Sequence, residues 1–437
     1  MIIPVLTYGE HVGFNEIEII DSLHSEILKK NLYTRKFQKF HKGKKQDLTC
    51  FKVAKVRPEE DFYQIESNYF IGIDWILEGK LVVNIQPKIN NNGQEVDYLK
   101  MLLDSVRHPE TMDHLDNLFE VYWDEPKITI SQKNDFLTPF LLLEFLGLLR
   151  QIVKKGLRKS YFRVEKNLYS RVKGKILVGK TIKHNAYKNK MLHTYCSFQE
   201  FGVDNLENKL LKKALQFAKF YLSSYNQLID TKGLLDLYNF INPAFEKVST
   251  EVDIRKIKDY KSNRFFKEYD EALRLAKMIF ERFGYNISSI AKKEIETPPF
   301  WIDMSRLFEI YVLALLKDVY GSDVEFQFEA DRNNHLDYLL NSKDEKFVID
   351  AKYKPKYINT QGKEETDIRQ VSGYARLKKV YKELYGNEDF DKIISGLIIY
   401  PDQNKGIVKI DVGKLKSIPI KPYIDIFKLG IKLPVIN

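Results

Sequence analysis

The feature that most constrains the fold lies near the C-terminus, where residues 335–352 read HLDYLLNSKDEKFVIDAK. Two runs rich in apolar residues flank a polar stretch, 341–344, that is typical of a turn. The pattern predicts two adjacent strands and places Asp337 and Asp350 close together at one end of the pair. Because side chains alternate along a strand, Asp350 and Lys352 should point to the same face. The predicted strands are 335–340 and 347–351.

Two carboxylates and an ammonium at one edge of a sheet suit metal-assisted cleavage of a phosphodiester. The carboxylates can bind a hard cation through oxygen, and the cation polarises the phosphoryl group and lowers the pKa of a bound water. The lysine can position that water or offset the developing negative charge. An acid followed two residues later by lysine also occurs elsewhere, for example at Glu78 and Lys80. The hairpin alone therefore fits a surface salt bridge equally well.

Length and composition set broad limits on the class of protein. A chain of 437 residues is too long for one compact core, so two or three domains are expected. The net charge of +10 favours an anionic partner such as nucleic acid, although a lysine-rich composition alone can produce it. The two cysteines, Cys50 and Cys196, predict neither a disulfide framework nor a zinc site and fit a reducing cytoplasm. We expect no signal peptide and no membrane span.

The first 90 residues or so are predicted to be mostly β, because short β-branched or aromatic runs alternate with glycine, asparagine and charge. Residues 17–32 instead have apolar side chains at helical spacing. Residues 34–45, TRKFQKFHKGKK, combine positive charge with aromatics and could contact phosphates and bases. A solvated loop is the favoured interpretation of this stretch. The expected strands are 2–7, 49–56, 69–73 and 81–87, with a turn at 78–80.

The middle of the chain is predicted to be mainly helical. Apolar residues recur at three-four spacing from Phe140 to Lys155, and Gly156 is a natural C-cap. A second strong helix begins at Asp204 or Asn205, either of which can cap it. The expected helices are 96–106, 140–155, 204–222, 234–245 and 268–283, and one strand is expected at 127–131.

Residues 174–181, GKILVGKT, match the phosphate-loop pattern G-x-x-x-x-G-K-[ST]. A true phosphate loop follows a buried strand and presents a tight turn of backbone amides. Here the middle, Ile-Leu-Val, is β-prone, and the four residues before Gly174 are too polar for a buried strand. We therefore expect a strand after Gly174 and no nucleotide-binding site. Nucleotide hydrolysis through this segment is the less favoured alternative.

The last part of the chain begins after Pro298-Pro299 and is predicted to be an α/β domain with a mixed central sheet. A helix over 304–320 can be capped by Asp303 or Ser305 and closed by Gly321. The other expected elements are a strand at 324–328, the 335–352 hairpin, a helix over 367–384 and strands at 393–400 and 406–412.

Three polar residues on these helices are candidates for the same site. Glu309 lies at the margin of an apolar stripe, where a third carboxylate could point toward the hairpin. Gln370 and Tyr374 are four residues apart, so they share a helix face and can both hydrogen-bond a phosphate or a base edge. Each of the three also fits an ordinary surface position.

This set of residues resembles the motif of the PD-(D/E)XK nuclease superfamily. The resemblance is carried by Glu309, Asp337, Asp350-Ala351-Lys352 and Gln370, and the Gln370–Tyr374 pair is similar to the Gln-x-x-x-Tyr extension of the RecB-like branch. One position departs, because Leu336 stands where the superfamily name has proline; that position contributes no ligand.

The resemblance implies a role for each residue of the set. Asp337 and Asp350 would bind Mg²⁺, and Lys352 would position or activate the attacking water. Glu309 would support the metal site through a water. Gln370 and Tyr374 would orient DNA near the scissile phosphate.

A narrower resemblance, to the McrC family of nuclease subunits in McrBC restriction systems, runs along most of the chain. The nuclease motifs are shared by the whole superfamily, and the motifs in the middle of the chain narrow the resemblance to McrC. The segments that carry it are 85–89 (IQPKI), 155–157 (KGL) with Tyr161, 172–176 (VKGKI), 204–208 (DNLEN), 303–309 (DMSRLFE) and 350–353 (DAKY).

The resemblance implies an α+β multidomain protein. A β-rich N-terminal domain over 1–125 would bind a partner, a mainly helical middle region would cover 126–290, and a PD-(D/E)XK endonuclease domain, an α/β domain, would cover 291–437. The chain would be the Mg²⁺-dependent endonuclease subunit of a GTP-dependent restriction system.

The same resemblance implies the partners of the chain. It would cut double-stranded DNA when docked on a McrB-like AAA+ GTPase hexamer, with its N-terminal region contacting the ring and stimulating GTP hydrolysis. The partner would bind GTP and recognise the modified base, such as 5-methylcytosine. The alternative is a catalytically degenerate adaptor that binds DNA and activates the GTPase.

Overall fold

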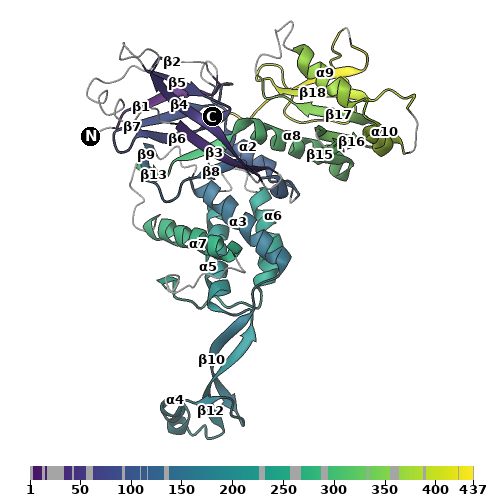
Figure 1. The fold of residues 1–437 in the computed structure, drawn as a ribbon. Helices are drawn as coiled ribbons and strands as arrows, with labels where there is room; N and C mark the ends of the chain where they lie inside the picture. The colour runs from purple at the N-terminus through teal and green to yellow at the C-terminus, as the bar shows by residue number, and fades with distance from the viewer. Residues whose placement is uncertain are drawn as a thin grey trace. The chain divides into compact units, whose positions relative to one another are not determined.

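The computed structural model in Figure 1 divides the chain into two compact units, Met1–Leu137 with Lys293–Asn437, and Thr138–Lys292. The predicted helix over 17–32 lies outside the described residues, and the division into three domains stays a prediction. The structure describes residues 3–11, 15–16, 34–41, 44–55, 63–90, 94–108, 110–115, 117–131, 137–225, 232–255, 267–286, 294–331, 334–354, 364–386, 390–421 and 423–436.

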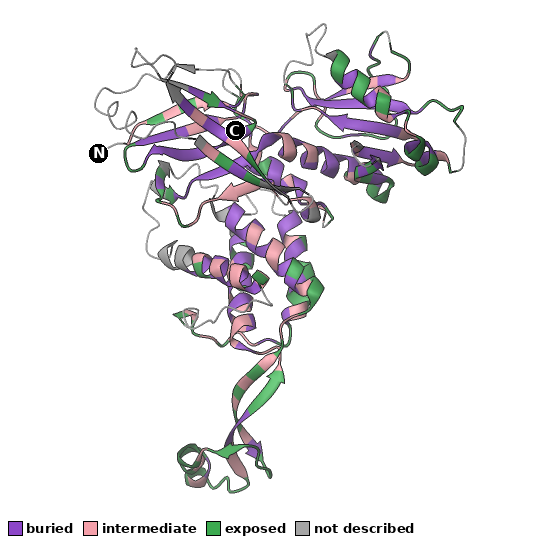
Figure 2. Cartoon of the chain, viewed as in Figure 1, coloured by how far each residue is buried: buried purple, intermediate pink, exposed green. Residues whose placement is uncertain are grey.

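The first unit contains a five-stranded sheet of order β1-β7-β6-β14-β8, in which β1 is parallel to β7 and the other neighbours are antiparallel. Every residue of β6 is buried (Figure 2). A Cβ at Gly72 in β6 would meet the carbonyl oxygen of Phe300 at 2.0 Å, so glycine there allows β14 to join the sheet. The strands are β1 (Val5–Gly9), β6 (Phe70–Leu77), β7 (Leu81–Gln86), β8 (Phe119–Val121) and β14 (Phe300–Asp303).

A second sheet, of order β2-β5-β4-β3, shares a buried apolar cluster with the first. Phe37, Phe51 and Ile65 contribute to this cluster from the second sheet, and Trp301 contributes from the first. The strands are β2 (Asn15–Glu16), β3 (Thr34–His41), β4 (Lys44–Lys55) and β5 (Tyr63–Ser67). The interpretation of residues 34–45 as a solvated loop is therefore wrong.

Alternation explains why this basic stretch forms a strand. Phe37 is buried, whereas its neighbours Lys36 and Gln38 are exposed, which is the period-two pattern of a strand with one buried face. Arg35 is largely buried, and its guanidinium donates to the carboxylates of Asp74 and Glu125 over 2.5–2.8 Å. The buried charge is thus paired, as burial requires.

The C-terminal sheet has the order β15-β16-β17-β18-β19. The first three strands are antiparallel and the last three parallel, so the sheet is mixed, as predicted. The Asp303 side chain caps α8 by accepting the N–H of Arg306 at 3.0 Å. The elements are α8 (Met304–Tyr320), β15 (Val324–Asp331), β16 (Asn334–Asn341), β17 (Lys346–Ala351), α9 (Glu364–Tyr374), α10 (Lys378–Tyr385), β18 (Ser395–Pro401) and β19 (Ile426–Ile431).

The expected single helix over 367–384 is wrong, because the chain forms α9 and α10 with Leu377 extended between them (φ −75°, ψ 129°). Val371 of α9 and Val380 of α10 enter the same buried cluster, so the apolar spacing continues across the break.

The expected strand over 406–412 is also wrong, because only an isolated bridge joins Ile407 to Ile431. Val408 and Val412 are exposed. The place beside β18 is taken by β19, which we did not predict.

Smaller elements complete the first unit. The Asp97 side chain caps α2 by accepting the N–H of Lys100 at 2.8 Å, and β9 pairs with β13 in antiparallel orientation. The predicted helix at 96–106 and the predicted strand at 127–131 are thus confirmed. The elements are α2 (Tyr98–Ser105), β9 (Ile128–Ser131) and β13 (Glu294–Thr297).

The second unit combines helices with an arm built on a three-stranded sheet of order β10-β12-β11 (Figure 1). Of the five α-helices described in this unit, four agree with the predicted helical segments, whereas α4 (Val178–His184) lies where a strand was expected. Among the described helices none has a stretch long and apolar enough to cross a bilayer. The arm, residues 160–202, was not predicted; in it β10 and β12 pair over ten residues each. The elements are α3 (Leu137–Lys155), β10 (Ser160–Tyr169), β11 (Lys175–Ile176), α4 (Val178–His184), β12 (His193–Gly202), α5 (Leu206–Tyr225), α6 (Lys232–Ile241) and α7 (Lys267–Asn286).

Buried amides fasten the base of the arm to the helices. Asn208 of α5 donates to the carbonyls of Arg158, before β10, and Val203, after β12, at 2.9 and 2.8 Å. Tyr269 of α7 donates to Asn208 Oδ1 at 2.9 Å. Asn205, one of the two predicted caps of α5, accepts the N–H of Asn208 at 3.0 Å. These bonds fix where both strands leave the helices.

Candidate active site

Asp337 and Asp350 lie opposite each other where the β16–β17 ladder ends. The last ladder pair is Tyr338 with Ile349, so the next step brings the two aspartates together. There the N–H of Ala351 donates to Asp337 Oδ2 at 2.8 Å. The predicted hairpin and the predicted proximity of its aspartates are both present in the structure.

Lys352 joins this carboxylate pair to helix α9. Its Nζ lies 2.8 Å from Asp350 Oδ2 and donates to Gln370 Oε1 at 3.0 Å. Its backbone N–H donates to the carbonyl of Ile399 in β18 at 2.8 Å. The neighbouring strand therefore holds the backbone from which the ammonium projects.

Gln370 and Tyr374 extend the network along α9. Gln370 Nε2 donates to the Tyr374 hydroxyl at 2.9 Å, which confirms that the two residues share a helix face. Asp350 is 1% exposed, whereas Gln370 is exposed. The row Asp350–Lys352–Gln370–Tyr374 thus leads from the buried sheet edge to the surface, where a large polyanion can reach it.

Glu309 lies at the margin of this network. On α8 its carboxylate pairs with Arg306 at 2.9 Å, and its backbone carbonyl accepts a hydrogen bond from the Tyr338 hydroxyl at 2.6 Å. Its negative charge contributes to a raised pKa at Asp337, so the two carboxylates interact. The structure therefore brings five of the six predicted residues into one network, and Glu309 lies nearby in an ion pair with Arg306. The five are Asp337, Asp350, Lys352, Gln370 and Tyr374.

Burial dominates the electrostatics of the site. It raises the pKa of Asp337 to about 7, with a further contribution from the charge of Glu309. It also raises the pKa of Asp350 to about 7, to which the charge of Asp337 adds. Burial opposes the charge on Lys352, but Asp350 and the other nearby carboxylates outweigh it and raise the pKa of the lysine. The ammonium therefore stays protonated at neutral pH.

The donor set fits a cation held by two carboxylates. Asp350 Oδ2 is buried and accepts no hydrogen bond of good geometry from the described residues, although the Lys352 ammonium lies 2.8 Å away. Within the part of the chain that the structure describes, no three His, Cys, Asp or Glu side chains gather as a metal site. Magnesium commonly uses only one or two carboxylates and keeps several waters, so the Asp337–Asp350 pair suits it.

A strained residue flanks Asp337. Gln327 of β15 lies between the Phe326–Tyr338 and Phe328–Leu336 pairs, directly opposite Asp337, and its φ is +54°. This left-handed conformation is unusual for glutamine, and such distortions of a strand are frequent beside active sites. Backbone strain leaves no signal in residue type, so the sequence could not reveal it.

Two further contacts next to the site were missed. Lys354 Nζ lies 2.7 and 2.9 Å from the carboxylate oxygens of Asp367 at the start of α9. Tyr353 donates to Glu10 Oε1 at 2.7 Å, across 343 residues of sequence. The alternation of Lys352 and Lys354 could have indicated the first contact, but no local pattern indicates the second.

The phosphate-loop match lies in the arm. The strand expected after Gly174 is present only as the two residues of β11. The rest of that expectation is wrong, because α4 begins at Val178. Thr181 donates to the Leu177 carbonyl and accepts the N–H of Tyr195, both at 3.0 Å, and Lys180 pairs with Glu165. The two side chains that a phosphate loop would present to its ligand are thus engaged within the arm, and the absence of a nucleotide site stays a prediction.

Comparison with known proteins identifies one family. The model of the McrBC 5-methylcytosine restriction system component family matches residues 66–385. No curated protein matches the chain.

Two solved structures are similar to the chain. One is a refined half-complex of Thermococcus gammatolerans McrB AAA+ hexamers with bound McrC, at 14% identity over 98% of this chain and 94% of that chain, with a TM-score of 0.35. Another is a cryo-EM structure of the Thermococcus gammatolerans McrBC complex, at 14% identity over 72% and 87%, with a TM-score of 0.27.

Proposed function

Because the chain belongs to the family of McrBC 5-methylcytosine restriction system components, we propose that it is the endonuclease subunit of such a system. In this proposal it hydrolyses phosphodiester bonds of double-stranded DNA with Mg²⁺, through a C-terminal domain of the PD-(D/E)XK type. A McrB-like AAA+ GTPase hexamer binds GTP, reads the modified base and controls cleavage.

The observation that carries the proposal is the connected row at the edge of the C-terminal sheet. Asp337 and Asp350 meet at the end of two strands, and Lys352 lies 2.8 Å from Asp350 while it donates to Gln370. A carboxylate pair and an ammonium that is already oriented are the groups that phosphodiester hydrolysis with a divalent cation requires. The row also reaches the surface, as a polymer substrate needs.

Each residue has a task that follows from its contacts. Asp337 and Asp350 would hold Mg²⁺, which polarises the phosphoryl group and lowers the pKa of a bound water. Lys352 stays protonated, so it donates hydrogen bonds and offsets negative charge at the reacting phosphate instead of accepting a proton. Gln370 orients the Lys352 ammonium, and Tyr374 orients Gln370. Glu309, held by Arg306, would act through a water.

The arm offers a surface for the partner. Tyr187 and Met191 near its tip are 83% and 74% exposed, and Tyr161 and Phe201 are exposed along its strands (Figure 2). Exposed apolar side chains gathered on one element mark interaction surfaces. In the similar Thermococcus gammatolerans structure, McrC is bound to McrB AAA+ hexamers. We assign ring binding to the arm tip, in addition to the N-terminal region expected from the sequence.

The test is a plasmid cleavage assay with Mg²⁺ on modified and unmodified DNA. The chain alone, the chain with its AAA+ partner and GTP, and Asp350→Ala in both settings are compared. Cleavage only by the complete wild-type mixture supports the proposal. Cleavage that survives Asp350→Ala places the active site elsewhere, and stimulated GTP hydrolysis without any cleavage favours the adaptor.

A further inference from the structure

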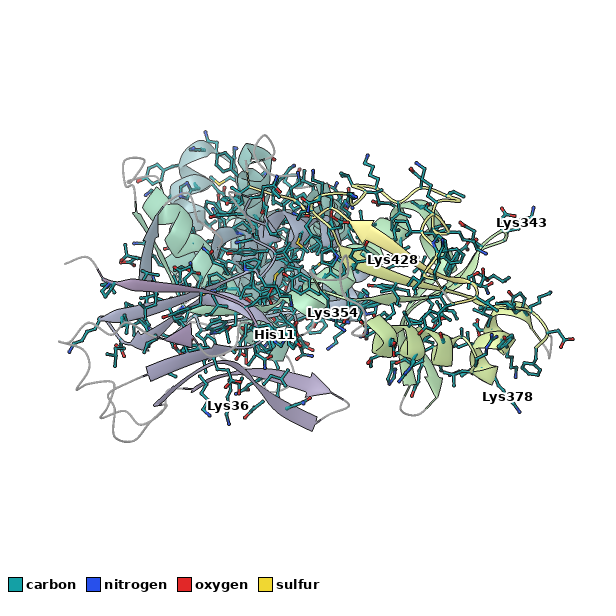
Figure 3. The ribbon with its side chains drawn as sticks, turned by 90° about the horizontal axis from the view of Figure 1, so that it is seen from above. His11, Lys36, Lys343, Lys354, Lys378 and Lys428 are labelled. Atoms are coloured by element: carbon teal, nitrogen blue, oxygen red, sulfur yellow. The ribbon has the colours of Figure 1, made fainter. Side chains whose placement is uncertain are left out.

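A buried contact joins the N-terminal strands to the catalytic strand. Glu10, directly after β1, is fully buried, and its Oε1 accepts the Tyr353 hydroxyl at 2.7 Å. Tyr353 is itself buried and immediately follows Lys352. His11 and Lys354, labelled in Figure 3, are the next residues along the chain from the two partners.

Further contacts hold both partners of this bond. The N–H of Glu10 donates to the Gln86 carbonyl at 2.8 Å, and Oε1 of Glu10 also accepts the N–H of Lys88 at 3.2 Å. The Lys88 ammonium lies 4.2 Å from the centre of the Tyr353 ring. The Phe308 ring of α8 lies 5.8 Å from the same ring. Tyr353 is therefore fixed from the N-terminal strands and from α8.

The short segment after β17 has little freedom of its own. The N–H of Lys352 is bound to the Ile399 carbonyl, and the N–H of Lys354 is bound to the carbonyl of Lys352 at 2.7 Å. The latter bond closes a three-residue turn with Tyr353 at its centre. A displacement of the Tyr353 side chain would therefore be passed to the backbone of Lys352 on one side and Lys354 on the other.

The same N-terminal strands also hold the start of α8. The N–H of Met304 donates to the Tyr69 carbonyl at 3.1 Å, beside β6, and Asp303 in β14 pairs with Phe70. Helix α8 carries Glu309 and its partner Arg306. The N-terminal sheet is thus the common support of two elements that build the site, and Glu10 is its contact with the strand that carries Asp350 and Lys352.

We propose that Glu10 is a positioning residue for the active site, which acts through its hydrogen bond to Tyr353 to set the place of Lys352. The proposal rests on the proposed nuclease function. It makes the N-terminal β region a requirement for cleavage as well as a binding region. A partner that shifts β1 or β7 would shift Lys352 with them.

The test compares four single variants, and the double variant that combines Glu10→Leu with Tyr353→Phe, in the complex with the partner, GTP and Mg²⁺. Glu10→Leu removes the acceptor, Tyr353→Phe removes the donor, and Glu10→Gln keeps an oxygen that can accept. Ser67→Ala is the matched control, because the Ser67 hydroxyl donates to the carbonyl of Gly9, next to Glu10, at 2.8 Å and does not reach Tyr353. Single-turnover cleavage rates are measured at saturating DNA, together with DNA affinity and thermal unfolding.

Glu10→Leu and Tyr353→Phe should each slow cleavage by about 10- to 100-fold, since a small misplacement of a reacting group has effects of this size. The double variant should be no slower than the slower single, because both changes break one bond. Glu10→Gln should retain most of the rate, and DNA affinity should be unchanged throughout. Additive losses, a wild-type rate for Glu10→Leu, or an equal loss for Ser67→Ala would overturn the proposal.

A second readout separates this proposal from the nuclease function itself. The rise in unfolding midpoint on adding Mn²⁺ at pH 8 reports the carboxylate pair without any cleavage. The N–H of Ala351 donates to Asp337, and Ala351 is two residues before Tyr353, so a displaced Tyr353 should disturb the carboxylate pair. The Mn²⁺-induced rise in unfolding midpoint should therefore be smaller in Glu10→Leu and Tyr353→Phe and unchanged in Ser67→Ala. If the wild-type complex does not cleave DNA, the nuclease proposal fails. The Mn²⁺ measurement then tests the positioning role of Glu10 by itself. An unchanged rise in unfolding midpoint in both Glu10→Leu and Tyr353→Phe would reject that role.

Discussion

The Nζ of Lys352 lies 2.8 Å from Asp350 Oδ2 while it donates to Gln370 on a helix 18 residues further along the chain. Sheet and helix are thus joined through one ammonium. The arrangement aims the lysine before any ligand binds, and preorganised charge of this kind is the main means by which enzymes stabilise a transition state. The proposed chemistry depends on keeping this geometry.

Asp350→Ala should abolish cleavage, with a loss of at least about 1,000-fold, while the chain still folds and binds its partner. The change removes one of the two proposed metal ligands and the carboxylate that lies beside the Lys352 ammonium. Plasmid nicking and co-purification with the AAA+ partner measure the two effects. Glu345→Ala, on the loop before β17, is the matched control and should cleave like wild type. Loss of partner binding in Asp350→Ala would show a structural role instead.

The metal-free chain should lose stability as the pH rises from about 4 to about 7. In the folded chain the pKa of Asp337 and of Asp350 is about 7, against 3.8 for an ordinary aspartate. Because the folded pKa is raised, the stabilisation from the protonated form is complete below pH 4 and is lost as the pH passes through 7. Chemical unfolding in EDTA across this range should show the slope, and Asp350→Asn should make it shallower, because only Asp337 of the pair then titrates.

Divalent cations should reverse this trend. If Mg²⁺ binds the ionised carboxylates as proposed, it should raise the unfolding midpoint more at pH 8 than at pH 5.5, where protons compete. Differential scanning calorimetry with Mg²⁺, and with K⁺ at matched ionic strength, measures the difference. An equal rise for both salts would indicate screening of charge and not a site at Asp337 and Asp350.

Gln370→Ala should slow cleavage by about 10-fold and leave folding unchanged, because the Lys352 ammonium loses the acceptor that orients it. Tyr374→Phe should have a smaller effect, since Tyr374 reaches Lys352 only through Gln370. Single-turnover rates at saturating DNA separate orientation from binding. If Gln370→Ala changed only the DNA affinity and not the cleavage rate, Gln370 would contact DNA without orienting Lys352.

Lys180→Ala should leave both GTP hydrolysis by the complex and DNA cleavage unchanged. The Lys180 side chain pairs with Glu165 on the surface of the arm, where an exposed ion pair contributes little. The isolated chain should bind no GTP in equilibrium dialysis. Binding that Lys180→Ala removes would mean that the phosphate-loop pattern is functional.

Tyr187→Ser with Met191→Ser should weaken partner binding without loss of fold, because both side chains are largely exposed and support no core. The loss expected is about 10-fold or more in affinity, measured by size-exclusion chromatography and titration with the AAA+ partner. Val408→Ser is a control on an exposed apolar residue outside the arm. An equal loss of partner affinity in Val408→Ser would show that the arm tip is not a specific part of the interface.

Local sequence patterns were enough to predict most strands and helices around the candidate site and to single out its polar residues. Alternation predicted the hairpin with Asp337, Asp350 and Lys352, and helical spacing predicted the face shared by Gln370 and Tyr374, because these patterns arise from the geometry of a single element. The predictions were wrong where the local pattern was ambiguous. The high charge of residues 34–45 suggested a solvated loop, but Arg35 pairs with distant carboxylates and the stretch forms a strand. The apolar spacing over 367–384 suggested one helix, but it continues through two.

Contacts between residues far apart in the chain could be read from the folded structure alone. Three examples are the addition of β14 to the N-terminal sheet, the hydrogen bond from Tyr338 to the Glu309 carbonyl, and the hydrogen bond from Tyr353 to Glu10. Each joins elements that are separate in the sequence. Such contacts form because a polar group that folding buries needs a hydrogen-bond partner, and that partner can come from any part of the chain. No stretch of sequence carries them alone.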